Sequence, residues 1–481
     1  MYDIKVQRVV QNLEKSYSGR IIPMHEWDNK IIPSTTKAIL KKHGLQGTLD
    51  LENPINCDDS LADAFFKAGW ELALELGFYC EDTERVIKVS EEELLESIRD
   101  YPDHIVLGEG QDAVTMYPRR PESTVEPLIE ASLGIVCSEE IYLPLVQGIV
   151  KYPKLVDALH GPSLATVFGH TIRSGSPLET LAGHYESKLK HEALWRAGRP
   201  GMCCVGVNSA ITEYGHLGGA AEVAGRGNVT QSLCPVEMKV TFSNFHRVLH
   251  GLNNGHKLRV GAFSYIGGFA GPPEGAALTC VANDLLVPVI LQSDYTSSYV
   301  YDIQLFGNCG RKALWANSVS TQAISRNTGY MRNKIVNQTG GPCTEMFMLE
   351  AAVGLMNHCV SGASISTQPR SAGGRYTDYI TPVECWWTGE VFKSCAGMTR
   401  VQANEIAKAL LPRYEGDLPA SDKGFSVYEC YDLKTQRPLP QYQELYSRVR
   451  NELIDLGMPL NNVYGDTFAG MDKDVKLHMS L

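Results

Sequence analysis

The feature that most constrains this chain is an alternation of short apolar runs with helix-like segments between roughly residues 130 and 370. Each run is long enough for a buried strand, and a segment with helical periodicity follows most of them. Eight runs have this character: 133–138, 164–169, 202–206, 228–232, 258–264, 288–293, 333–338 and 363–367. Such alternation predicts a parallel sheet, and eight units predict a (β/α)8 barrel, an α/β fold of the TIM-barrel type. A doubly wound open sheet is the alternative arrangement of the same elements.

The segments on either side of this alternation have mainly helical patterns. Residues 58–77 and 90–102 carry apolar side chains at helical spacing, and each begins with residue types that cap helices. The chain beyond about residue 380 shows the same periodicity. We therefore expect an N-terminal helical extension over 1–125, the barrel over 126–375, and a C-terminal helical extension over 376–481 that packs on the barrel.

Charge and cysteine usage exclude several classes of protein. The net charge of -11 disfavours binding to nucleic acid or to an anionic membrane, since both require a basic surface. The amino terminus lacks the apolar core of a signal peptide, and the apolar run at 285–291 is shorter than a membrane-spanning helix. The thirteen cysteines show no CxxC spacing, which indicates free thiols in a reducing compartment. We expect a cytoplasmic protein.

Functional residues of such a barrel follow the carboxyl ends of its strands. In this sequence those positions carry amides, hydroxyls and aromatic rings, with few carboxylates. We expect substrate to bind there through Asn208, Tyr265, Gln292, Asp294, Tyr295 and Tyr299. An anionic Asp294 beside tyrosine rings is a combination with which proteins can hold a methylated ammonium group. The alternative interpretation of residues 292–302 is a polar turn whose tyrosines pack at their ring edges.

Three histidines suggest a different chemistry. His246 and His250 are four residues apart, so a helix would place both on one face, and His256 follows shortly after. Zinc proteases use such a pair, but their glutamate is replaced here by Arg247. We therefore expect the pair to lie at a solvent-facing or core-edge position, and we expect no metal site.

Several longer motifs resemble the monomethylamine methyltransferase family, whose members are corrinoid-dependent. The motifs occur in family order across roughly residues 60–480: FFKAGWELALELGFYCEDTERV, HIVLGEGQDAV, WRAGRPGM, IGGFAG, GGPCTEM and YECYDLKTQRP. The resemblance implies a (β/α)8 barrel and a homo-oligomer, typically a hexamer. It also implies a partner protein that carries the corrinoid (cobalamin-type) cofactor and accepts the methyl group on Co(I).

The resemblance also shows where this chain departs from the family. Members that act on monomethylamine carry pyrrolysine at the position that falls on Val205, and valine has no electrophilic or hydrogen-bonding atom. The two glutamates and one glutamine that surround pyrrolysine fall on Gln231, Gly261 and Ile335. Carboxylates left in a pocket without their partner would be uncompensated charges, so their joint loss is physically reasonable. These four positions are our candidates for the catalytic centre.

The resulting functional expectation is a pyrrolysine-independent methyltransferase. It would move a methyl group from a small N-methylated amine, tertiary or quaternary, to the Co(I) corrinoid of a cognate partner protein, without a tightly bound cofactor of its own. The alternatives are an O-demethylating corrinoid methyltransferase that acts on a methoxylated compound, a catalytically silent barrel subunit, and a zinc enzyme that uses the three histidines.

Overall fold

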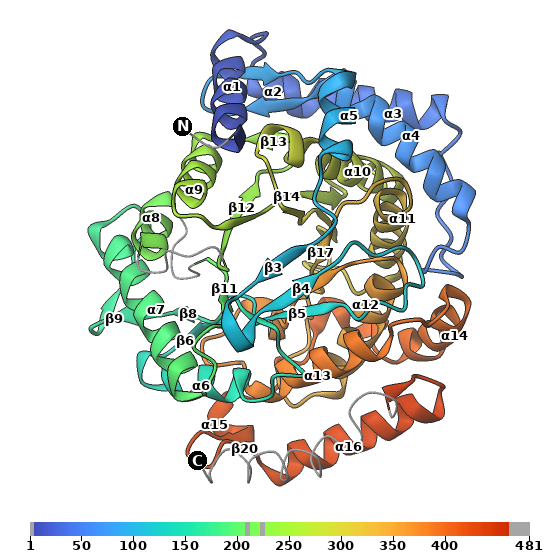
Figure 1. Cartoon of the computed structure of the whole chain (residues 1–481). Coiled ribbons are helices and arrows are strands. Elements are labelled where there is room, and N and C mark those ends of the chain that lie inside the picture. Colours follow the sequence, from blue (N-terminus) through green and yellow to red (C-terminus); the bar gives the residue numbers. More distant parts are fainter. Residues whose placement is uncertain (1–3, 207–211, 222–226, 461–481) are drawn as a thin grey trace.

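A computed structural model describes residues 4–206, 212–221 and 227–460 of the chain. Its centre is a closed parallel barrel with eight strand positions in this described part (Figure 1). In barrel order the strands are β5 (Leu128–Ala131), β7 (Ala158–Leu159), β11 (Cys203–Cys204), β12 (Val229–Cys234), β14 (Lys257–Ile266), the pair β15 (Tyr295–Thr296) and β16 (Tyr299–Asp302), β17 (Asn333–Lys334) and β18 (Ile365–Thr367).

Two single bridges close the barrel where the longer ladders end. Val205 pairs with Val229 and joins β11 to β12, while Thr296 pairs with Arg332 and joins β15 to the strand of β17. β18 then pairs with β5, so every barrel strand has a parallel neighbour on both sides. The predicted (β/α)8 barrel is confirmed, and the open sheet is excluded.

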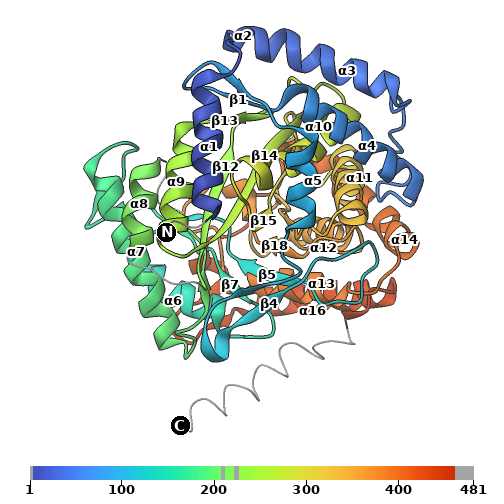
Figure 2. The ribbon, with the colours of Figure 1, turned by 45° about the horizontal axis from the view of Figure 1, so that its top comes forward.

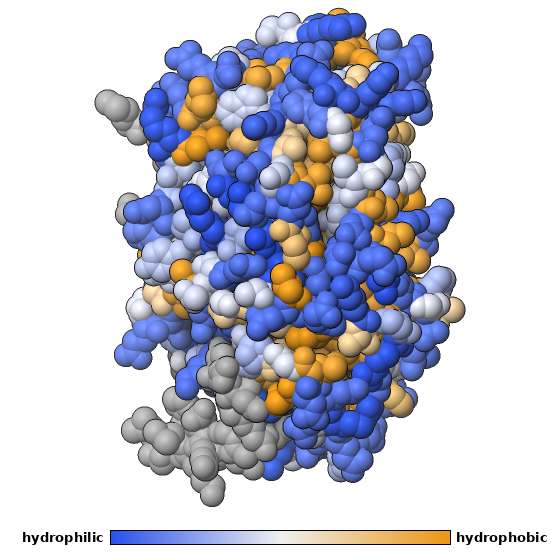
Figure 3. Space-filling view, turned by 90° about the vertical axis from the view of Figure 1, so that its right-hand side faces the viewer, coloured by the Kyte–Doolittle hydropathy of each residue, from blue (hydrophilic) through white to orange (hydrophobic). Residues whose placement is uncertain are grey.

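Helices cover the outside of the strands. In chain order they are α6 (Glu139–Val150), α7 (Pro177–Arg196), α8 (Glu213–Ala221), α9 (Phe242–Asn253), α10 (Pro273–Ile290), α11 (Arg311–Asn327), α12 (Glu345–Val360) and α13 (Pro382–Ser394). Among the described residues only α10 is long and apolar enough to span a membrane, but 94% of its 18-residue window is buried, as in the core helix of a folded domain. On the face in Figure 3, hydrophilic groups surround separate hydrophobic patches.

Three of the eight predicted strands are wrong. Residues 133–138 contain only the short β6 (Val136–Cys137), which pairs with β8 (Ser163–Leu164) outside the barrel, and the barrel strand is β5. Residues 164–169 include β9 (Thr166–Val167), which forms a hairpin with β10 (His170–Thr171). The run at 288–293 is the end of α10 and the following loop. A helix buried on all sides has no polar face, so its apolar run looks like a buried strand.

The N-terminal part lies along one side of the barrel, as Figures 1 and 2 both show. Its helices are α1 (Ile4–Ser18), α2 (Met24–Glu26), α3 (Ile32–Lys42), α4 (Asp59–Leu76) and α5 (Glu91–Arg99), with a short π-helix at Trp27–Ile31. The helices predicted at 58–77 and 90–102 are confirmed as α4, capped by Asp58, and α5, which begins with a Ser90–Glu93 capping box.

This part also contains two hairpins that the helical patterns did not predict. The first is β1 (Phe78–Cys80) with β2 (Arg85–Ile87), and β1 also pairs with β13 (Lys239–Val240). The second is β3 (Ile105–Leu107) with β4 (Val114–Met116).

The β3–β4 hairpin crosses the amino end of the barrel (Figure 1). The Gly108 main-chain N–H donates to the Gly227 carbonyl over 2.8 Å, and that of Glu109 donates to the Gly201 carbonyl over 2.7 Å. Apolar side chains of the hairpin, including Ile105 and Leu107, pack on the inward residues at the starts of the strands. The amino end is therefore sealed, and access to the interior is left to the carboxyl end.

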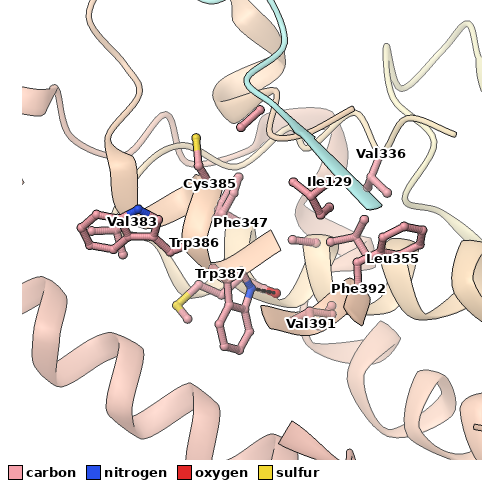
Figure 4. Close-up of a cluster of buried hydrophobic side chains, with 14 of the residues drawn as sticks. Ile129, Val336, Phe347, Leu355, Val383, Cys385, Trp386, Trp387, Val391 and Phe392 are labelled. Atoms are coloured by element: carbon pink, nitrogen blue, oxygen red, sulfur yellow. Dashed lines mark hydrogen bonds between the residues drawn. The ribbon is translucent and has the colours of Figure 1, made fainter. Parts of the chain in front are cut away.

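The C-terminal part covers the side of the barrel opposite the N-terminal helices (Figures 1 and 2). After α13 it contains α14 (Arg400–Leu410), α15 (Val427–Cys430), the hairpin β19 (Tyr431–Asp432) with β20 (Arg437–Pro438), and α16 (Pro440–Asp455). Trp386 and Trp387 of α13 are buried in the same hydrophobic cluster as Phe347 and Ile129 (Figure 4). The Trp387 indole donates to the Met348 carbonyl over 3.1 Å, so its one polar atom has a partner.

Candidate functional site at the carboxyl end of the barrel

A buried polar layer crosses the middle of the barrel. The strand register brings Glu130 of β5, Gln231 of β12, Arg259 of β14 and Thr367 of β18 to one level. The Arg259 guanidinium donates to the Glu130 carboxylate, to the Gln231 side-chain oxygen and, over 2.7 Å, to the Thr367 hydroxyl. Arg259 and Glu130 have no exposed surface, so neither charge is available to a ligand without breaking the pair.

His160 joins this layer from the loop after β7. Its Nε2 atom lies 2.5 Å from the Gln231 side-chain oxygen and 3.3 Å from an Arg259 nitrogen. Burial lowers the pKa of His160 well below its usual value, and the charges of Arg259 and Lys190 lower it further. A neutral imidazole in this position completes the layer and is a poor proton donor.

An aromatic cluster lies above the polar layer, toward the carboxyl end. Phe263 and Tyr265 of β14 are paired in register with Tyr299 and Tyr301 of β16, and Ile335 packs beside them. Ring centroids are 4.9 Å apart for Phe263 and Tyr299 and 5.4 Å apart for Tyr299 and Tyr301. Phe263 and Tyr265 are half-buried, whereas the other three residues are buried. The inner wall of the barrel near its carboxyl end is therefore aromatic.

The tyrosine hydroxyls of this cluster remain protonated. Burial raises the pKa of Tyr301 to about 12, and the positive charge of the nearby Arg370 guanidinium opposes that rise. Burial also raises the pKa of Tyr299 well above its usual value. Hydroxyls of such high pKa can donate hydrogen bonds but are weak acids.

Arg370 is a charged residue near the cluster. It follows β18, is half-buried, and its main-chain N–H donates to the Gln338 side chain over 2.9 Å. Within the described parts of the chain, Arg370 forms no ion pair, unlike Arg259 with Glu130. Among the described residues, the site thus combines aromatic surface with a guanidinium that has no carboxylate partner.

The predicted catalytic positions fall at different depths in this site. Val205 points inward with Cys203 but is completely buried among the apolar residues near the amino end. Gln231 lies in the polar layer and Ile335 in the aromatic cluster. At Gly261 a Cβ atom would lie 1.9 Å from the Ser297 carbonyl oxygen, so packing against the break between β15 and β16 demands glycine there.

The predicted substrate-binding residues divide into two groups. Tyr265 and Tyr299 lie together in the aromatic cluster, and Tyr295 lies below them, where its hydroxyl donates to Glu130 over 3.4 Å. Asn208 lies outside the described residues.

Gln292 and Asp294 belong at the other end of the barrel, which corrects the sequence prediction. They precede β15 because the strand predicted at 288–293 is helical. The Asp294 carboxylate accepts the main-chain N–H of Leu258 and pairs with Lys5, each at 2.8 Å. Gln292 donates to main-chain carbonyls at the end of α10. Neither side chain faces the aromatic cluster.

The cysteines and histidines of the sequence patterns lie away from the site. Cys204 packs on the helices outside the barrel, and burial raises its pKa to about 11. His246 is exposed, whereas His256 is buried and its Nδ1 lies 2.9 Å from the Thr230 hydroxyl. Over residues 4–206, 212–221 and 227–460, no three His, Cys, Asp or Glu side chains are grouped to hold a metal ion.

Comparisons with known proteins agree with this architecture. Residues 7–458 match the family described as monomethylamine methyltransferase MtmB. Monomethylamine methyltransferase MtmB2 of Methanosarcina barkeri is 29% identical over 92% of this chain and 97% of its own length, and MtmB of Methanosarcina mazei is 28% identical over the same shares.

The fold is equally similar. The crystal structure of the Methanosarcina barkeri monomethylamine methyltransferase MtmB superposes with a TM-score of 0.89 at 27% identity, covering 94% of this chain and 98% of that one. The crystal structure of the hydroxylamine MtmB complex gives the same values. This chain therefore belongs to the monomethylamine methyltransferase MtmB family and is a methyltransferase.

Proposed function

We propose that this chain moves a methyl group from a small tertiary or quaternary N-methylated amine to the Co(I) corrinoid of a partner protein. The observation that carries this proposal is the aromatic cluster of Phe263, Tyr265, Tyr299 and Tyr301 at the carboxyl end of the barrel. Aromatic faces attract methylated ammonium groups. Val205, the position of pyrrolysine by family resemblance, offers no group that could bind an amine covalently.

The leaving group explains why such a site needs little acid–base chemistry. In the transfer the C–N bond breaks, its electron pair stays on nitrogen, and the acceptor Co(I) supplies the pair for the new bond to the methyl carbon. A quaternary ammonium donor leaves as a neutral amine, so no proton is required. The protein has only to hold the cation and direct one methyl group, which is a proximity effect.

The chemistry of these residues suits a methoxylated substrate less well. An ether oxygen would leave as an alkoxide unless an acid or a metal stabilised it. Burial raises the pKa of Tyr299 and Tyr301 and lowers that of His160, so these groups are weak proton donors.

The corrinoid protein is the second substrate of this transfer, and it must reach the same end of the barrel. Apolar side chains are exposed on the loops that follow β14 and β16: Phe269 is 36% exposed, Ile303 44% and Phe306 78%. Exposed apolar groups on these loops support docking of another protein there. The family resemblance adds a homo-oligomer, typically a hexamer, and no tightly bound cofactor.

A reconstituted transfer assay tests the proposal. Purified enzyme is mixed with a Co(I) corrinoid protein and a panel of donors: simple methylamines from monomethylamine to tetramethylammonium, N-methylated amines with other substituents, and methoxylated compounds. We expect a spectroscopic change of the corrinoid with at least one tertiary or quaternary N-methyl donor, and a tenfold or larger loss in Tyr299→Leu. Tyr428→Leu on α15, where the ring is 55% exposed, is the matched control. Methylation by methoxylated donors alone would refute the proposal.

A further inference from the structure

The carboxyl end of the barrel carries hydrogen-bond donors. A simple methylammonium ion has no acceptor atom and cannot use them. Arg370, which is half-buried, contributes a guanidinium whose positive charge acts on Tyr301. Two other arginines near the barrel strands each have a buried carboxylate: Arg259 pairs with Glu130, and Arg332 pairs with Asp284. In the described parts of the chain Arg370 has no such partner.

A second donor is fixed by the polar layer. The Gln231 side-chain oxygen accepts from Arg259, and this assignment determines the orientation of the amide, because the opposite one would place two donors together. The Gln231 amide nitrogen is then the polar atom left for the half-exposed side of the residue. It carries two N–H groups and can only donate.

Two buried acidic side chains near the site, Glu130 and Glu237, already accept hydrogen bonds from the protein. Both Glu130 oxygens accept hydrogen bonds, from Arg259 and Thr367 on one side and from Tyr295 on the other. A Glu237 oxygen accepts the main-chain N–H of Tyr265 over 3.0 Å, and this residue is completely buried. The Glu130–Arg259 pair is neutral overall, whereas Arg370 has no carboxylate partner among the described residues.

We infer that the methyl donor also carries a carboxylate, which Arg370 and Gln231 bind while the aromatic cluster holds the methylated ammonium group. The donor class is therefore an N-methylated amino acid, a zwitterion. This inference rests on the proposed function, since it specifies the substrate of the same site. A donor that was only a cation would meet the guanidinium without a counter-ion, whereas a carboxylate forms charge-assisted hydrogen bonds with it.

The same guanidinium could instead bind an anionic group of the corrinoid carried by the partner protein. The two possibilities predict different effects of Arg370: it changes the KM either for the methyl donor or for the corrinoid protein. If the carboxylate belongs to the methyl donor, loss of the guanidinium raises the KM for that donor and leaves the KM for the corrinoid protein unchanged.

Matched pairs of donors provide the test. N-methylglycine, N,N-dimethylglycine and N,N,N-trimethylglycine are each compared with the corresponding methylated ethylamine, which keeps the methylation state and removes the carboxylate. We expect the glycine member of at least one pair to have a kcat/KM at least tenfold higher. In Arg370→Gln that preference should fall about ten- to hundredfold, as for the loss of a charged hydrogen bond, and Arg370→Lys should restore part of it.

Arg196→Gln is the control, because Arg196 lies on α7 and pairs with Glu192 at the exposed surface. Equal kcat/KM values for both members of every pair would overturn the inference, as would an Arg370→Gln effect confined to the corrinoid protein. Isothermal titration of N,N,N-trimethylglycine without the corrinoid protein adds a readout that is independent of turnover. If no N-methyl compound of either series is a donor, the proposed function itself fails, which is a distinguishable result.

Discussion

The buried ion pair between Arg259 and Glu130 leads to a prediction about stability. Both side chains have no exposed surface, and both also hydrogen-bond to neighbouring polar groups. Removing one partner leaves the other charge buried without compensation. We therefore expect Arg259→Met to lower the free energy of unfolding by about 3–5 kcal/mol.

The neutral double variant separates the charge effect from the loss of packing. In Arg259→Met combined with Glu130→Met no charge remains, and replacement of a buried pair by apolar residues is often neutral. We expect the double variant to recover most of the stability lost in the single variant. Glu130→Gln, which keeps the shape of the side chain, is a milder variant in case Arg259→Met does not fold.

Urea unfolding, followed by the fluorescence of the six tryptophans and by circular dichroism, measures these effects. The exposed pair of Arg196 and Glu192 supplies the comparison, since a pair of this kind contributes only about 0.3–0.5 kcal/mol. If Arg259→Met shifts unfolding no more than Arg196→Met does, the layer does not stabilise the barrel in the way we describe.

Three further predictions concern single positions. Burial raises the pKa of Glu350 to about 7 from 4.5, so the folded state holds its proton more tightly and stability should fall as pH rises from about 4.5 to 7. Glu350→Gln should flatten that slope, as judged by urea midpoints at pH 5 and 8. Gly261→Ala should lower the thermal midpoint because its Cβ would meet the Ser297 backbone, whereas Gly329→Ala, with open space around it, should not. Asp294→Ala should weaken the fold by roughly 1–3 kcal/mol without changing the KM for the methyl donor, since its carboxylate binds Leu258 and Lys5 at the amino end.

The alternation of strands and helices was sufficient to predict the barrel, but not every strand in it. β5 was missed because Glu130 interrupts its apolar pattern, and that charge is tolerated only because Arg259 arrives from another strand. α10 was mistaken for a strand at its end because all of its faces are buried. In both cases tertiary contacts determine the secondary structure, and a short stretch of sequence does not reveal those contacts.

The same errors explain what was missed in the site. Placing a strand at 288–293 brought Asp294 to the wrong end of the barrel, and with it the anion proposed to hold the ammonium group. Tyr265 was predicted at the carboxyl end because its strand, β14, was assigned to nearly the correct residues, whereas Tyr299 was placed there from the wrong strand at 288–293 and lies within β16 instead. A signal for the polar layer was present: an arginine within the apolar run 258–264 requires a partner if the strand is buried.

The structure also changes what the departures from the family mean. The absence of a side chain at Gly261 follows from the Ser297 backbone, so that position need not reflect a changed substrate. Val205 is completely buried, which leaves Gln231 and Ile335 as the two altered positions in the polar layer and the aromatic cluster. One is a hydrogen-bond donor and the other is apolar. The methyl donor that we propose, with a carboxylate at one end and N-methyl groups at the other, would offer an acceptor to the first position and an apolar group to the second.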